Sequence, residues 1–136
     1  MGNEEGEILS LRAKTKESLP LAGEQIVARY FRYMDSKDID AMLELFDYDA
    51  VVYEPFSNTT GGLKGRSSIE PFLKVAMMVN SNLQRTIKIV KPSKPNEITA
   101  LVTFEKGDKV KSKLMFEFED DQVREKKIKS LHIEFL

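Results

Sequence analysis

Apolar residues recur at helical spacing in three early segments of the chain. In the first segment Ile26, Tyr30 and Met34 lie four positions apart, so they share one face of a helix. Ser36 and Asp38 precede the second segment, and either can cap a helix there, because a short side-chain oxygen can accept from the free backbone N–H groups of a helix start. The pattern therefore predicts three helices, over residues 21–35, over residues 38–46 with Phe46 on the apolar face, and from about residue 67 with Leu73 on the apolar face.

Further along the chain the spacing of apolar residues changes to two. After residue 82, apolar and polar residues alternate, and Gly107-Asp108 separates two such runs as a hairpin turn does. An earlier strand is predicted over residues 50–56. Helices followed by a run of antiparallel strands are typical of an α+β fold, and the alternation gives its sheet one buried face. The predicted inner face includes Ile98, Ala100, Val102, Phe104, Leu114, Phe116, Phe118, Leu131, Ile133 and Phe135.

The chain has 136 residues, which is the length of one domain. Residues 1–18 are polar and charged, and we expect a tail or a short helix there. Residues 19–136 are expected to form a single domain. The acidic N-terminal sequence differs from secretory signals and transit peptides, so the expected location is the cytoplasm.

The composition excludes several classes of site. The chain has no cysteine, which excludes disulfides and thiolate chemistry, and its one histidine excludes a multi-histidine metal centre. The formal net charge is −1, so we expect no nucleic-acid partner and no membrane-surface partner. No apolar run approaches the roughly 20 residues that span a bilayer. We therefore expect neither a metal site nor a membrane segment.

Glu54 is the most informative polar residue of the predicted first strand. Side chains two apart in a strand share a face, so Glu54 lies with Ala50 and Val52 while Tyr53 lies with Val51. If the Val52 face is the inner one, Glu54 enters an apolar interior. Desolvation there disfavours the charged carboxylate, which suits Glu54 to accept a proton as a general base near neutral pH. Because Val51 and Tyr53 form an equally apolar face, the pattern alone leaves the direction of Glu54 open.

Tyr30 and His132 are the other candidates for chemistry. Tyr30 lies in the middle of the apolar face of the first helix, where its hydroxyl either bonds to the backbone in the core or donates to a developing oxyanion in a pocket. His132 alternates with the inward residues of the last strand. It is therefore predicted on the outer face of the sheet or at a subunit contact.

Several short stretches are informative as a set. They are Ala28-Arg29-Tyr30, Met34-Asp35, Asp38-Ile39-Asp40-Ala41-Met42, Asp49-Ala50-Val51-Val52, Glu54-Pro55-Phe56 and Gly65-Arg66. This set resembles the SnoaL-like polyketide cyclase branch of the nuclear transport factor 2-like superfamily, and within that branch the ketosteroid isomerases. The similarity is continuous over residues 28–56 and looser as far as residue 136.

The resemblance implies an α+β fold of the nuclear transport factor 2-like or cystatin-like kind. In that fold a cone-shaped, curved antiparallel (mixed-edge) sheet packs against three N-terminal helices around a deep apolar pocket. The resemblance also implies that Glu54 moves a proton next to a carbonyl group and that Tyr30 donates a hydrogen bond to the resulting enolate oxygen. It implies no cofactor, a small apolar molecule as partner, and a homodimer. The residues expected to line the pocket are Val52, Phe46, Leu73, Leu114, Phe116, Leu131 and Phe135.

Three functions remain open at this point. The first is a cofactor-independent isomerase or cyclase in which Glu54 is the base and Tyr30 the hydrogen-bond donor. The second is a binding module whose pocket holds an apolar ligand that Glu54 only orients. The third is an association domain in which side chains fill the pocket and the outer face of the sheet forms a dimer. The fold alone does not separate these functions.

Overall fold

The computed structural model describes residues 23–57, 61–81, 83–90, 94–106, 108–119 and 126–136. The expected tail or short helix at residues 1–18 lies outside the described residues. No helix in these ranges is long and apolar enough to cross a membrane. The helices are α1 (Gly23–Ser36), α2 (Ile39–Glu44) and α3 (Arg66–Val79), and the strands are β1 (Phe46–Tyr53), β2 (Leu63–Lys64), β3 (Gln84–Val90), β4 (Glu97–Lys106), β5 (Asp108–Phe118) and β6 (Ile128–Phe135).

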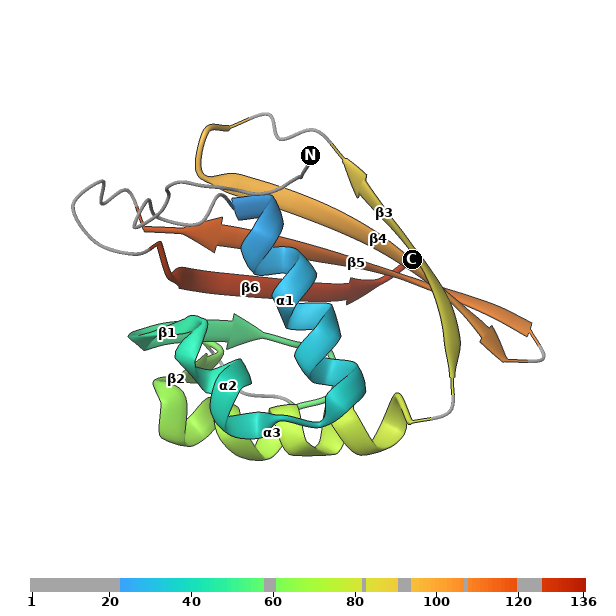
Figure 1. Ribbon diagram of the computed structural model, residues 1–136, viewed down its shortest axis with the longest axis horizontal. Helices are drawn as coiled ribbons and strands as arrows, with labels where there is room; N and C mark the ends of the chain where they lie inside the picture. Colours follow the sequence, from blue (N-terminus) through green and yellow to red (C-terminus); the bar gives the residue numbers. More distant parts are fainter. Residues whose placement is uncertain (1–22, 58–60, 82, 91–93, 107, 120–125) are drawn as a thin grey trace, which may run out of the picture.

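The strands form one open sheet in the order β2-β1-β6-β5-β4-β3. Neighbouring strands are antiparallel except β1 and β6, which pair in parallel inside the sheet. Helix α1 crosses the sheet that contains the long strands β4 and β5, and the helices lie on one side of this twisted sheet (Figure 1). The structure confirms the predicted α+β class, with helices packed against a mixed sheet.

The first strand differs from its predicted range of residues 50–56. It begins at Phe46, which the helical spacing had assigned to the second helix, and it ends at Tyr53. Pairing with β6 fixes the start, because Phe46 pairs with Ile128 and the Ile128 N–H donates to the carbonyl oxygen of Leu45 at 2.8 Å. The prediction was wrong because this partner lies far along the chain, where a local pattern cannot detect it.

Strand β2 lies in the glycine-containing segment between β1 and α3. Lys64 pairs with Val51 and Leu63 pairs with Val52, so β2 lengthens the sheet beyond β1. Gly62 precedes it with φ +83°, a conformation that side chains with a Cβ rarely adopt. A Cβ on Gly62 would also lie 2.8 Å from Cγ1 of Val51. The glycine is therefore required for the close approach of the two strands.

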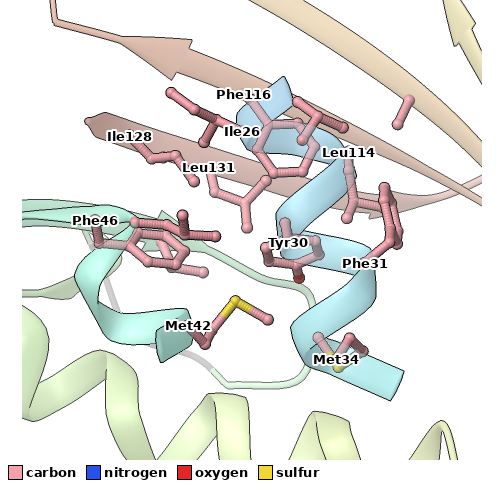
Figure 2. Packing of buried hydrophobic residues seen from close by; sticks show 14 of the residues in the cluster. Ile26, Tyr30, Phe31, Met34, Met42, Phe46, Leu114, Phe116, Ile128 and Leu131 are labelled. Carbon is pink, nitrogen blue, oxygen red and sulfur yellow. The ribbon is translucent and has the colours of Figure 1, made fainter. Parts of the chain in front are cut away.

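The core lies between the helices and the inner face of the sheet (Figure 2). Ala50 and Val52 are buried while Tyr53 is exposed, so the Val52 face of β1 is the inner one. In the later strands the predicted alternation holds, with Val102, Leu114 and others buried. The fully buried side chains that fill the centre include Ile26, Met42, Phe46, Val52, Ile69, Leu73, Phe116, Ile128 and Leu131.

Arg66 joins the start of α3 to the junction of α2 and β1. Its Nε and Nη2 donate to the carbonyl oxygen of Phe46 at 3.0 and 2.6 Å. The guanidinium also lies 4.1 Å from the ring centroid of Tyr48, and its Nη1 is 3.5 Å from a carboxylate oxygen of Glu44. The Gly65-Arg66 part of the resemblance therefore has a structural role, which is to fix α3 against the sheet.

Candidate functional site

A pocket of about 850 Å³ lies between α3, the C-terminal half of α1 and the inner face of β4, β5 and β6. Its lining is mainly apolar. The apolar lining residues include Phe31, Met34, Phe72, Val102, Phe104 and Ile133. A pocket of this size and character fits a small organic molecule that is mostly apolar.

Tyr30 borders the pocket from α1. The ring is buried, and it makes edge contacts with Phe31 and Phe116, with centroids 5.1 Å away in each case. Figure 2 shows the hydroxyl oxygen on the side of the ring that faces away from Phe116, toward Met42 and Met34. Among the described residues no hydrogen-bond partner is found for this hydroxyl. Burial raises the pKa of Tyr30, against the opposing effect of the Arg85 charge, so the phenol is neutral and can donate.

Glu54 borders the same pocket, just beyond the end of β1. Its carboxylate accepts a hydrogen bond from the Phe56 N–H at 2.7 Å and from the Ser57 N–H at 3.2 Å. The Ser57 hydroxyl donates to it as well. Because these donors come from the following turn, the position of the carboxylate at the pocket edge is fixed locally.

The residues that the resemblance assigned to the pocket divide into two groups. Leu114 and Phe135 line the pocket. The other five, Val52, Phe46, Leu73, Phe116 and Leu131, are fully buried in the core.

Arg85 at the start of β3 is a charged lining residue that the sequence reasoning missed. Its Nη1 lies 2.7 Å from a carboxylate oxygen of Asp35, and its Nη2 donates to the carbonyl oxygen of Phe31 at 3.2 Å. These contacts hold β3 against the end of α1. A signal was present in the sequence, because Arg85 alternates in phase with Ile87 and Ile89 and therefore shares their face.

Ser112 is a second polar residue that the sequence reasoning missed. It is buried on β5 and lines the pocket. Its phase with Leu114 and Phe116 was the available signal.

His132 lies on the other side of the sheet from the pocket. Its exposed ring stacks on Tyr53 with the centroids 4.2 Å apart, so the predicted outer-face position is confirmed. In the described ranges no group of histidine, aspartate and glutamate side chains is arranged to hold a metal ion.

Searches of protein-family models and of curated proteins find no match to this chain. Solved structures do match. A steroid delta-isomerase from Pseudomonas aeruginosa has a TM-score of 0.65 and 16% identity, covering 88% of this chain and 84% of that one. A nuclear transport factor 2-like protein of unknown function from Cytophaga hutchinsonii has a TM-score of 0.61 and 11% identity, covering 88% and 95%. SalBIII, an epoxide hydrolase/cyclase-like enzyme of pyran ring formation in salinomycin, has a TM-score of 0.61 and 18% identity, covering 83% and 89%.

At these identities the similarity establishes the fold. The chain has the fold of the nuclear transport factor 2-like superfamily, as the resemblance of its sequence predicted. This fold accommodates a steroid isomerase, a cyclase-like enzyme and a protein of unknown function among these neighbours. The activity of this chain must therefore be argued from its own pocket.

Proposed function

We propose that the protein binds a small, mostly apolar carbonyl compound in the pocket between α3 and the sheet. The volume of about 850 Å³ is the observation that carries this proposal, because a cavity of this size with a mainly apolar lining favours such a molecule. The neutral hydroxyl of Tyr30 supplies a hydrogen-bond donor for the carbonyl oxygen.

A proton transfer next to the carbonyl group follows from the same arrangement. Glu54 removes a proton from the carbon beside the carbonyl, and the electrons of the broken C–H bond form an enolate. Tyr30 donates a hydrogen bond to the enolate oxygen, which carries the new negative charge. Glu54 then returns the proton to a different carbon of a conjugated enolate, which moves a double bond and completes an isomerisation. The support is that Glu54 and Tyr30 border one pocket although they come from different elements.

Exchange of hydrogen for deuterium tests this chemistry directly. With 2-decanone in heavy water, a base in the pocket replaces the protons beside the carbonyl by deuterium, which proton NMR follows. We expect Glu54→Gln to lower the exchange rate by at least about a hundredfold while calorimetry still detects binding. Asp49→Asn, which neutralises an exposed carboxylate on the preceding strand β1, is the matched control and should keep the wild-type rate.

A binding module without catalysis is the second candidate. It is favoured by the hydrogen bonds from Phe56 and Ser57 to the Glu54 carboxylate, since they give this side chain a role in the turn. If Glu54→Gln leaves both exchange and binding at wild-type values, proton transfer by Glu54 is excluded. Binding of 2-decanone with no exchange above the solvent rate, by the wild-type protein, supports the binding module.

A further inference from the structure

The Arg85 guanidinium is buried at one side of the pocket with part of its hydrogen-bonding capacity unused. The side chain is only 8% exposed. Its two terminal nitrogens are engaged by Asp35 and by the carbonyl oxygen of Phe31. Its Nε is buried and has no hydrogen-bond partner among the described residues. An unpaired N–H of a buried cation is costly, so the contacts with α1 account for only part of this arginine.

The charge of Arg85 is also incompletely balanced on the pocket side. Asp35, its carboxylate partner, is 65% exposed and therefore largely in water. Of the described lining residues, only Arg85 and Glu54 are charged. Glu54 follows β1 and Arg85 lies at the start of β3, two strands that are not neighbours in the sheet, and among the described residues no ion pair joins the two side chains. Glu54 is thus no partner for Arg85.

Tyr30 lies within electrostatic reach of Arg85. The positive charge of Arg85 opposes the rise that burial causes in the pKa of Tyr30. Both side chains line the pocket and lie beside the ring of Phe31, whose centroid is 5.1 Å from that of Tyr30 and 5.4 Å from Cζ of Arg85. Apolar side chains surround them, with Phe31 on α1 and Phe104 paired to Arg85 on β4.

We propose that Arg85 and Tyr30 form a carboxylate-binding corner of the pocket, and that the ligand is an apolar molecule with a carboxylate group. A guanidinium matches a carboxylate in shape and charge, and Arg85 brings that charge to the pocket lining. This inference rests on the proposed function, because it requires the pocket to take a small apolar molecule. A purely structural arginine would need no more than its contacts with α1.

Calorimetric titration with decanoate and 2-decanone tests the corner. The two probes share a ten-carbon skeleton, and only decanoate carries a negative charge. We expect wild-type protein to bind decanoate more tightly. Arg85→Met should weaken decanoate binding by about 10- to 100-fold and change 2-decanone binding little. Lys88→Met, which removes an exposed charge from the same strand, is the control and should keep the preference for decanoate.

Asp35→Asn supplies a test that does not depend on the folding of Arg85→Met. Removing the partly exposed carboxylate leaves the guanidinium charge less balanced, so decanoate should bind several-fold more tightly. A structural role for the ion pair predicts no such gain. Unchanged decanoate affinity in Asp35→Asn, or an intact preference in folded Arg85→Met, overturns the inference. Equal binding of both probes by wild-type protein also overturns it and leaves the proposed function standing, whereas binding of neither probe refutes the proposed function itself.

Discussion

Replacing Tyr30 by phenylalanine removes one oxygen at the pocket and keeps the ring. The ring is 2% exposed, and its edge contacts with Phe31 and Phe116 do not involve the hydroxyl. Among the described residues that hydroxyl has no hydrogen-bond partner to lose. We therefore expect the free energy of unfolding to change by less than about 1 kcal/mol, whereas loss of a bonded buried hydroxyl costs about 1–3 kcal/mol.

The same substitution should affect function strongly. Loss of one donor to an oxyanion typically lowers the rate by about a hundred- to a thousandfold. Urea denaturation and deuterium exchange into 2-decanone, measured on one preparation, give both quantities. A stability loss above about 2 kcal/mol with an unchanged exchange rate would show that the hydroxyl is structural and would refute the reasoning.

Alkaline pH gives a second readout of Tyr30. Burial raises the pKa of the folded phenol above its ordinary value of 10.0, and Arg85 lowers it by less. Above about pH 10 the unfolded chain releases this proton while the folded chain keeps it, so the free energy of unfolding falls as pH rises, by up to about 1.4 kcal/mol per pH unit. Tyr30→Phe should lack this part of the decline. Tyr48→Phe, at a site that is 74% exposed, is the control, and identical declines in both variants would contradict the argument.

Four further substitutions test the core, a turn, the pocket and the dimer. Phe116→Ala should lower the free energy of unfolding by about 3–5 kcal/mol in urea, because a fully buried ring is removed. Gly62→Ala should lower it by roughly 1–3 kcal/mol, since φ is +83° and the new Cβ would crowd Val51. Ala76→Trp should fill the pocket and abolish 2-decanone binding while the circular dichroism spectrum stays unchanged. The homodimer stays a prediction; if it uses the outer face of the sheet, Tyr53→Lys should shift the protein to monomer in light scattering.

The sequence could predict the class of the fold because its alternation is local. Residues of β4 and β5 follow the period of two without interruption, so their inner face was correct. The start of β1 at Phe46 could not be predicted in this way, because it depends on pairing with Ile128. Strand β2 has two residues, which is too short for any periodic pattern.

Only part of the candidate site was predicted from the sequence. Glu54 and Tyr30 were candidates from their places in the pattern, which left the direction of Glu54 open, and the resemblance assigned their roles. Arg85 was missed although its phase with Ile87 places it on the inner face. Because arginine is rarely buried, the expectation for such a position is a surface residue even when its phase is inward. Such a residue is instead a marker of a site, since its burial must be compensated.

The position along the strands, rather than the face, separates pocket from core. Residues paired across neighbouring strands form rows on the inner face. One row is wholly in the core: Ile98, Phe116, Leu131 and Val52. Two rows further along the strands line the pocket: Val102, Ser112 and Phe135, then Arg85, Phe104 and Val110. All these residues lie on the inner face of the sheet, so the alternation of apolar and polar residues cannot distinguish the rows. The register does, and it places the buried charge of Arg85 in the row farthest from the core.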